Sequence, residues 1–150
     1  MENEPILLLT HNGWGLELVK SVQMIVGEVT NVHKVALQAE DSLGDYLERV
    51  TEKIDQLTWH NQLLILTDVK GGTPSNVALR LSKDYDLLIV SGLCTSLLLE
   101  SVMKQSGPGF RLQDAEMIQQ AAVDSCQILE IPKEESTGEQ NVKNRINKSR

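Results

Sequence analysis

The chain contains few aromatic residues, few cysteines and fewer basic than acidic side chains. Two Trp, two Tyr and one Phe make up only 3% of its 150 residues, too few for a surface on which nucleic-acid bases stack. Acidic side chains outnumber basic ones by 21 to 14, and the net charge of −7 argues against nucleic acid as a partner, because phosphate binding needs clustered Lys and Arg. The two cysteines, Cys94 and Cys126, offer no disulfide framework and are expected to be small buried thiols.

Long apolar runs and targeting signals are also missing. Runs such as Leu63–Leu66 are far too short to span a bilayer, and the N-terminus lacks the pattern of a signal peptide, so we expect a cytoplasmic protein. No glycine pattern of the P-loop or dinucleotide-binding type is present, and we expect neither direct use of ATP nor any cofactor. His33 and His60 have no Cys or acidic residue at ligand spacing, which predicts surface histidines and no metal site.

Charge and apolar content divide the chain into a domain and a tail. Residues 1–132 carry 18 acidic and 9 basic side chains, a net charge of −9. Residues 133–150 carry a net charge of +2 and only Val142 and Ile146 as core-forming residues. We therefore predict one globular domain over residues 1–132 and a disordered polar tail or linker remnant over residues 133–150.

Short apolar runs alternate with segments of helical periodicity. Continuous runs of branched apolar residues are typical of buried parallel strands. Strands are predicted at Ile6–Leu9, Val32–Leu37, Leu63–Leu66 and Asp86–Ser91, with a short last strand at Cys126–Ile131. Apolar residues three and four positions apart predict helices at about Leu16–Val26, Leu43–Leu57, Thr73–Leu81, Ser96–Gln105 and Asp114–Asp124. Asp41-Ser42 can cap the second helix, and Thr73 as N-cap with Pro74 after it is a strong start for the third.

This alternation predicts an α/β fold with an open, mostly parallel sheet and helices on both faces. We assume the common strand order 2-1-3-4, in which the first and third strands are neighbours. The loops that begin with His11 and Asp68 then face one crevice at the carboxyl ends of the strands, where such folds bind ligands.

The residues of this crevice have a shared chemistry. Imidazole is a good nucleophile near pH 7, since its reference pKa is about 6.5. A carboxylate on one ring nitrogen, here Asp68 on His11, would fix the tautomer and turn the other nitrogen outward. Backbone N–H groups at Gly71 and Gly72, with the Thr73 hydroxyl and a helix N-terminus behind them, would bind phosphoryl oxygens. Together these groups suit a covalent phosphohistidine.

Each of these features also has an ordinary structural interpretation. A histidine at a strand end often bonds a nearby backbone group, and an aspartate before a helix often serves as a cap. A Gly-Gly pair is usually a turn. Trp14, in the loop after His11, either packs against the crevice wall or forms part of a docking surface for a partner.

Three segments of the sequence stand out, namely residues 9–15 with 24–27, residues 66–76, and Ser91-Gly92 with Leu98-Leu99-Glu100. They resemble motifs of the mannose-family IIA domains of the bacterial phosphoenolpyruvate-dependent sugar phosphotransferase system. Residues 9–15 with residues 24–27 resemble the opening of these domains, and residues 66–76 resemble their second motif, an Asp followed by Gly-Gly-Ser/Thr-Pro and Asn. Ser91-Gly92 with Leu98-Leu99-Glu100 resembles the third motif. The resemblance covers roughly residues 5–131, and its second motif is the most specific.

The resemblance implies a phosphotransferase without a cofactor. His11 would be the phosphorylated residue, Asp68 its hydrogen-bond partner, and Thr73 would take the place of a phosphate-contacting hydroxyl. The phosphoryl group would come from HPr and pass to a IIB protein or domain, and the membrane IIC and IID components would be reached only indirectly. The family forms homodimers, in which the last strand, here Cys126–Ile131, pairs antiparallel with the partner's sheet.

The chain departs from the family at two places. Asn12 stands where the family often has Gly, and Asn tolerates a left-handed backbone better than most residues. Cys94–Leu97 replaces an Asn-Leu-Pro-Met stretch, which bears on partner choice. Two alternatives therefore stay open: a regulatory or sensor module for which phosphorylation of His11 is a signal, and a receiver-like domain phosphorylated on Asp68. The second lacks the acidic pair expected near the end of the first strand.

Overall fold

The four strands form a single parallel sheet. The computed structural model describes residues 2–133 of the chain. The strands are β1 (Ile6–His11), β2 (Val32–Leu37), β3 (Leu63–Thr67) and β4 (Leu87–Ser91). Their order is β2-β1-β3-β4, and each neighbouring pair is parallel, as the alternation of elements predicted.

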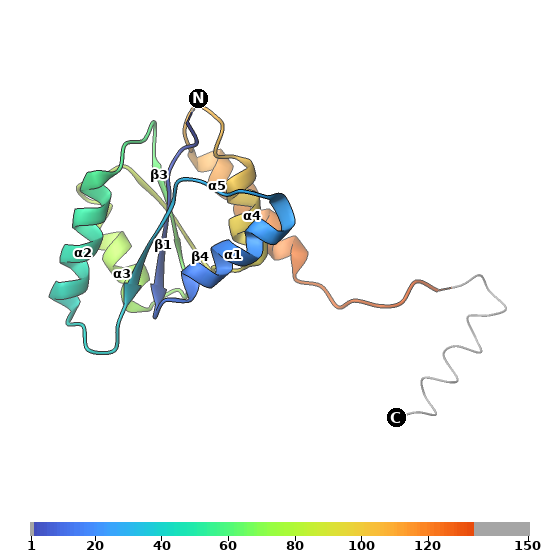
Figure 1. Cartoon of the computed structure of the whole chain (residues 1–150), viewed down its shortest axis with the longest axis horizontal. Helices are drawn as coiled ribbons and strands as arrows, with labels where there is room; N and C mark the ends of the chain where they lie inside the picture. The colour runs from blue at the N-terminus through green and yellow to red at the C-terminus, as the bar shows by residue number, and fades with distance from the viewer. Residues whose placement is uncertain (1, 134–150) are drawn as a thin grey trace.

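Five helices cover the two faces of the sheet. They are α1 (Trp14–Val26), α2 (Leu43–Gln56), α3 (Thr73–Leu81), α4 (Thr95–Met103) and α5 (Leu112–Ser125). Helices α2 and α3 lie on one face, and α1, α4 and α5 lie on the other (Figure 1). Each predicted helix is present, with ends that differ from the prediction by at most a few residues.

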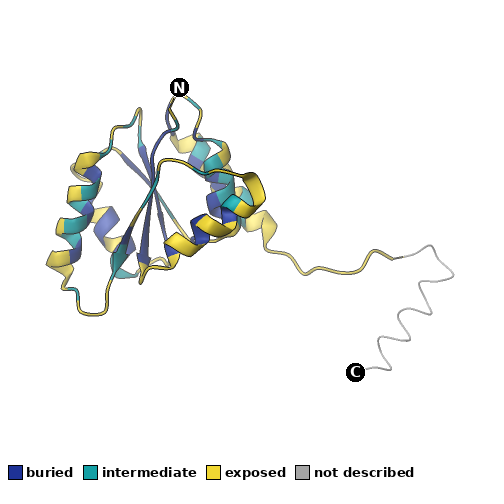
Figure 2. Cartoon of the chain, viewed as in Figure 1, coloured by how far each residue is buried: buried dark blue, intermediate teal, exposed yellow. Residues whose placement is uncertain are grey.

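The central strands are buried on both faces, which explains their continuous apolar runs. Along β1, Ile6 and Leu8 join the apolar core under α1, α4 and α5, while Leu7 and Leu9 join the core under α2 and α3. All four side chains are fully buried, as the dark strands of Figure 2 show. Burial of each such side chain stabilises the fold by about 1.5–3 kcal/mol, so these strands anchor the loops that follow them.

Helix starts follow local sequence rules at α2 but not at α3. The Ser42 side chain accepts a hydrogen bond from the Asp45 backbone N–H, and the Asp45 carboxylate accepts one from the Ser42 N–H, a complete capping box. The predicted N-cap of the third helix was wrong by one residue. Gly72 is the N-cap of α3, and Thr73 is already its first helical residue. The Gly72 carbonyl accepts the Asn76 N–H at 3.0 Å, so the first helical hydrogen bond already starts at Gly72.

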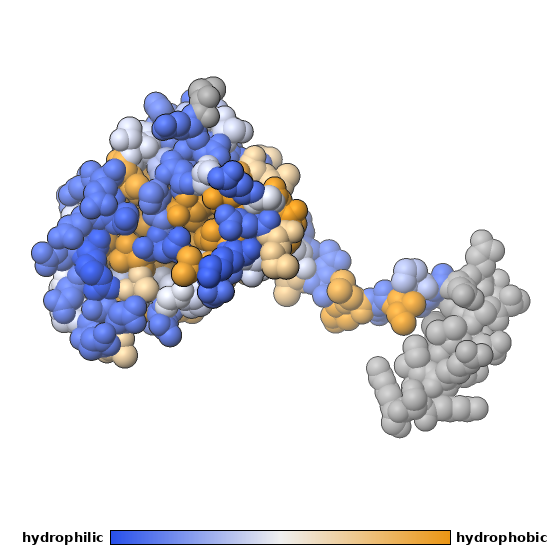
Figure 3. All heavy atoms as spheres, in the orientation of Figure 1, coloured by the Kyte–Doolittle hydropathy of each residue, from blue (hydrophilic) through white to orange (hydrophobic). Residues whose placement is uncertain are grey.

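The pairing of the predicted last strand with a second copy stays a prediction, because a single chain is described. Cys126–Ile131 forms no strand in the single chain, because no strand of the described chain lies beside it to supply a hydrogen-bonded ladder. The segment instead runs away from the domain, and Ile128, Leu129 and Ile131 are 93%, 89% and 85% exposed. Figure 1 shows this stretch running away from the domain, and Figure 3 shows hydrophobic residues along it.

The expectation of buried cysteines was wrong as well. Cys94 and Cys126 are both exposed free thiols. Cys94 is the N-cap of α4 and Cys126 the C-cap of α5, and both helix ends lie at the surface.

Two further observations bear on the sequence-based expectations. Within residues 2–133, no helix combines the length and the apolar character needed to cross a membrane. The same residues contain no cluster of three or more His, Cys, Asp or Glu side chains suited to a metal ion. Apart from Lys133, the predicted tail at residues 133–150 lies outside the described residues, and the domain boundary near Pro132 stays a prediction.

Candidate functional site

Sheet register brings His11 and Asp68 together. Strands β1 and β3 are parallel neighbours, with Leu9 opposite Thr67. Asp68 directly follows β3, and its backbone N–H donates to the Leu9 carbonyl at 3.3 Å. The carboxylate therefore reaches the end of β1, across 57 residues of sequence, as the predicted strand order requires.

One carboxylate holds both the backbone and the ring of the histidine. Asp68 Oδ2 accepts the His11 backbone N–H at 2.6 Å and lies 2.8 Å from His11 Nδ1. Because an ionised carboxylate can only accept, Nδ1 carries the ring proton and Nε2 carries the free lone pair. The side chain of His11 is 48% exposed and that of Asp68 only 11%. A nucleophilic nitrogen thus stands at the surface on a ring that is fixed from beneath.

The environment keeps Asp68 ionised. Burial acts to raise its pKa, but hydrogen bonds from the His11 backbone N–H and ring, and the charge of that ring, outweigh burial and hold the pKa below its usual value. The Val69 N–H adds a further hydrogen bond, to Oδ1 at 2.8 Å. Asp68 is therefore an anion at neutral pH, suited to compensate positive charge on the imidazole.

The turn after His11 tolerates asparagine in place of glycine. Asn12 has a φ of 59°, a left-handed conformation that Asn adopts more readily than most residues. Its side-chain oxygen accepts the Gly13 N–H at 2.9 Å, and its carbonyl accepts the Thr10 hydroxyl at 2.6 Å. This departure from the family pattern leaves the His11 backbone in place. Trp14 begins α1 directly after the turn and is 38% exposed, so a docking role for it stays a prediction.

The glycine pair lies against the imidazole. A Cβ atom added at Gly72 would lie 2.7 Å from His11 Cε1 and 3.0 Å from Val69 Cγ1, so any side chain there would collide with the histidine ring. Gly71 has a φ of +85°, which favours glycine for a different reason. The structure thus brings four predicted site residues together: His11, Asp68, Gly71 and Gly72.

The fifth predicted residue, Thr73, opens α3 next to Gly72. Among residues 2–133, its hydroxyl has no hydrogen-bond partner and does not cap the helix. A role in phosphate contact stays a prediction. Such a hydroxyl at a helix start remains available as a donor to an anion.

Sequence reasoning missed two hydroxyls beneath the site. Thr67 Oγ1 and Ser75 Oγ are 2.7 Å apart, and Ser75 Oγ donates to the Val69 carbonyl at 2.6 Å. Both residues are buried. A polar residue at the end of an apolar strand and another in the first turn of the next helix were the available signals.

A second histidine is also held by a carboxylate, at the opposite end of the sheet. His60 Nδ1 lies 2.7 Å from Glu4 Oε1, and its backbone N–H donates to Glu4 Oε2 at 3.2 Å. The His60 side chain is 78% exposed, as predicted, but its acidic partner lies 56 residues away and was not foreseen. His33 is half-buried, and its ring lies 2.7 Å from the Asn31 side-chain oxygen.

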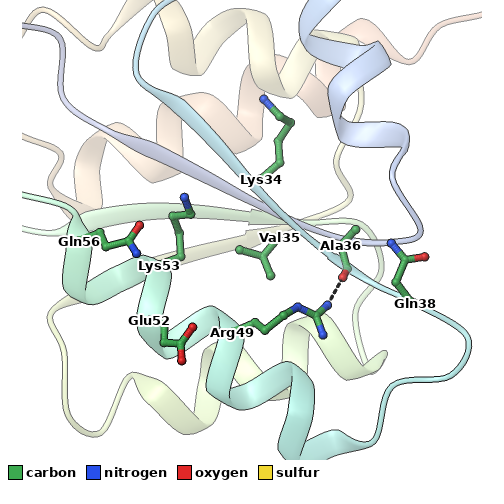
Figure 4. A pocket seen from close by; sticks show the side chains of 8 residues that line it. All are labelled: Lys34, Val35, Ala36, Gln38, Arg49, Glu52, Lys53 and Gln56. Carbon is green, nitrogen blue, oxygen red and sulfur yellow. Dashed lines mark hydrogen bonds between the residues drawn. The ribbon is translucent and has the colours of Figure 1, made fainter.

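A hollow of about 440 Å³ lies beside β2, an edge strand of the sheet, and His11 is not among the residues that line it (Figure 4). It is lined by Lys34, Val35, Ala36, Gln38, Arg49, Glu52, Lys53 and Gln56. Arg49 donates to the Ala36 carbonyl at 2.5 Å and to both oxygens of Asp41 at 2.8 and 2.9 Å. The guanidinium thereby covers part of an exposed strand edge, a common protection against pairing with another chain.

The fold and site together define an open α/β domain with an exposed histidine that a carboxylate orients at the carboxyl edge of the sheet. The sequence profile described as the PTS system fructose IIA component matches residues 5–112. The chain therefore belongs to this family, the mannose-type IIA family of the sugar phosphotransferase system. The resemblance seen in the sequence is confirmed.

Two curated relatives show the range of similarity. The PTS system mannose-specific EIIAB component of Escherichia coli K12 is 29% identical over 108 residues, which cover 70% of this chain and 33% of that protein. The PTS system sorbose-specific EIIA component of Lacticaseibacillus casei is 30% identical over 96 residues, covering 63% of this chain and 69% of that protein. The chain thus spans about a third of the length of the EIIAB relative.

Solved structures share the fold. The mannose/sorbose-specific IIA subunit from Enterococcus faecalis has a TM-score of 0.79 and 26% identity, and the match covers 89% of this chain and 99% of that one. EIIA from Streptococcus agalactiae has a TM-score of 0.72 at 24% identity, covering 84% and 95% of the two chains.

Proposed function

We propose that this chain is a phosphocarrier of the sugar phosphotransferase system, acting in the cytoplasm as a phosphotransferase. His11 accepts a phosphoryl group from phospho-HPr and passes it to a IIB protein or domain, which serves sugar uptake through the IIC and IID membrane components. The observation that carries this proposal is the double hold of Asp68 on His11, which leaves Nε2 as an exposed nucleophile. Family membership supports it.

The proposed step exchanges one nitrogen–phosphorus bond for another. His11 Nε2 attacks the phosphorus of the donor phosphohistidine, the new bond forms, and the donor imidazole leaves with the electron pair of the broken bond. The His11 ring becomes positively charged, and the Asp68 carboxylate beside Nδ1–H stabilises that charge. We propose that amides at Gly71 and Gly72 and the Thr73 hydroxyl bind the phosphoryl oxygens. A loose phosphoryl-transfer transition state needs mainly such positioning and charge stabilisation.

Charge supports the proposed donor. Residues 1–132 carry a net charge of −9, which would raise the encounter rate with a donor whose docking face is basic. A receiver-like role for Asp68 is disfavoured, because both of its oxygens already accept hydrogen bonds and its side chain is only 11% exposed.

We further propose a homodimer in which residues 126–131 add an antiparallel strand to β4 of the second copy. Strand β4 is an edge of the sheet, and a hollow of about 250 Å³ lies between it and α5, lined in part by Ile89, Val90 and Ala115. The exposed apolar residues of the 126–131 segment would be covered by such pairing.

The relay is tested by phosphorylation with purified components. Incubation with phosphoenolpyruvate, enzyme I and HPr is expected to give an acid-labile phosphate on the wild-type chain and none on His11→Ala. Label that persists in His11→Ala would overturn the assignment. Transfer of the label onward to a cognate IIB supports the relay, whereas a labelled chain that does not pass it on favours the regulatory alternative, to which the altered Cys94–Leu97 stretch points.

A further inference from the structure

Ser75 connects three parts of the site from beneath. It is the third residue of α3, only 5% exposed, and its hydroxyl lies 2.7 Å from Thr67 Oγ1 and 2.6 Å from the Val69 carbonyl oxygen. Thr67 ends β3, and Val69 lies in the loop that carries the glycine pair. The Ser75 hydroxyl therefore connects the end of β3, the loop after it and the start of α3 by hydrogen bonds.

The direction of the protons in this chain of hydrogen bonds follows from the partners. A carbonyl oxygen can only accept, so the single Ser75 hydroxyl proton is given to Val69. Ser75 Oγ must then accept the proton of Thr67 Oγ1. The chain runs from Thr67 through Ser75 to Val69, and hydrogen bonds aligned in this way strengthen each other.

The Val69 carbonyl also accepts a second hydrogen bond, from the backbone N–H of Gly72 at 3.3 Å. This distance is longer than the usual range for N–H donors, whereas the 2.6 Å bond from Ser75 is short. Gly72 is the residue that lies against the His11 ring. Its amide is thus weakly engaged at the place where a phosphoryl group on Nε2 would need donors.

We propose that Ser75 is a positioning residue that makes the Gly72 amide available to the phosphoryl group; this inference rests on the proposed function of His11. When the amide turns from Val69 to a phosphoryl oxygen, the carbonyl keeps the Ser75 hydroxyl as its partner. Without Ser75, the same movement would leave the Val69 carbonyl without either of its two protein hydrogen-bond donors, which makes the movement less favourable. Ser75 acts through Gly72 and touches no reacting atom.

The unphosphorylated protein gives the first test. In Ser75→Ala the Gly72 N–H becomes the sole donor to Val69, so its hydrogen exchange, followed by NMR, is expected to slow by about tenfold, roughly what one hydrogen bond is worth. Ser101→Ala is the matched control, because Ser101 is also buried and also donates to a carbonyl, Leu97 in α4, far from the site. It should leave Gly72 exchange unchanged. Unchanged Gly72 exchange in a folded Ser75→Ala variant would overturn the proposal.

Phosphoryl transfer gives the second test. With phospho-HPr as donor, Ser75→Ala is expected to lower kcat by about tenfold and to leave KM unchanged, since Ser75 lies beneath the site and not on a docking surface. Ser75→Thr, which keeps the hydroxyl, should restore kcat. A wild-type kcat for Ser75→Ala, or a loss seen only in KM, would contradict the proposal.

A third variant covers the case in which Ser75→Ala does not fold. Ser75→Cys preserves size and a weak donor, so intermediate values of Gly72 exchange and kcat are expected, and wild-type values would count against Ser75. Failure of the proposed function can be told apart from failure of this inference. If the proposed function is wrong, the wild-type chain itself takes no phosphate from phospho-HPr. The hydrogen exchange of Gly72 in the unphosphorylated protein then still tests whether Ser75 shares the Val69 carbonyl with Gly72.

Discussion

A single carboxylate oxygen of Asp68, Oδ2, binds His11 at two places: it lies 2.6 Å from the backbone nitrogen and 2.8 Å from the ring nitrogen Nδ1. The first bond locates the strand end and the second orients the ring. The position of the nucleophile therefore depends on a single carboxylate that two buried parallel strands hold in place.

Replacement of Asp68 with Asn tests this dependence. The amide is nearly the same size but carries no charge, so the positive ring that forms during transfer loses its compensation and the tautomer is no longer fixed. We expect the rate of phosphorylation by phospho-HPr to fall about 100-fold or more. Asp114→Asn is a suitable control, because Asp114 accepts the Arg111 backbone N–H at the start of α5 and takes no part in the site. Equal rates for the two variants would contradict the role of Asp68.

The lowered pKa of Asp68 predicts a pH dependence of stability. A carboxyl group whose pKa is lower in the folded than in the unfolded state stabilises the fold at any pH above its unfolded value, here the ordinary 3.8. This contribution is lost as the pH falls from 3.8 through the lowered folded pKa. Urea unfolding at a series of pH values should show that Asp68→Asn removes this part of the acid destabilisation. A wild type and variant with parallel pH profiles would show that Asp68 is not perturbed.

Gly72 is predicted to admit no side chain. The Cβ of Gly72→Ala would lie 2.7 Å from His11 Cε1, so the ring must move and its bond to Asp68 must weaken. We expect phosphorylation to fall by at least tenfold, since small displacements of reacting groups are costly. Gly44→Ala in α2 is the control, because its Cβ would meet only Ser42 Oγ at 3.8 Å, an ordinary contact. That variant should keep full activity and gain up to about 1 kcal/mol of stability.

The sequence predicted that His11 and Asp68 lie close together because both follow apolar runs that the assumed strand order makes neighbours. Continuous apolar runs indicated parallel strands, and the common strand order then placed two distant strand ends side by side. The network of Thr67 and Ser75 escaped prediction, since a single small polar residue within a strand or helix breaks no periodicity. The N-cap of α3 was misplaced for a related reason. Local preference favours Thr73, but the first helical hydrogen bond already runs from the Asn76 N–H to the Gly72 carbonyl, at a position where the His11 ring leaves no room for a side chain.

The pair of Glu4 and His60 shows the same limit. The spacing of residues along the chain does not show that Glu4, before β1, lies beside His60, before β3, since 56 residues separate them. The predicted last strand is missing in the single chain for a different reason, because a strand forms only where a neighbouring strand supplies backbone hydrogen bonds. Within one chain nothing lies beside residues 126–131, and the apolar pattern that predicted a strand there remains exposed.

The exposed 126–131 segment leads to a prediction about assembly. Leu129→Asp places a charge on a side chain that is 89% exposed in the single chain but would be covered against β4 of a second copy. Sedimentation should therefore show a dimer for the wild type and a monomer for the variant. A Leu129→Asp variant that sediments as a dimer would contradict strand pairing through this segment. Because His11 and Asp68 come from one chain, the monomer should still be phosphorylated by phospho-HPr, and loss of labelling together with the dimer would indicate that the second copy contributes to the site.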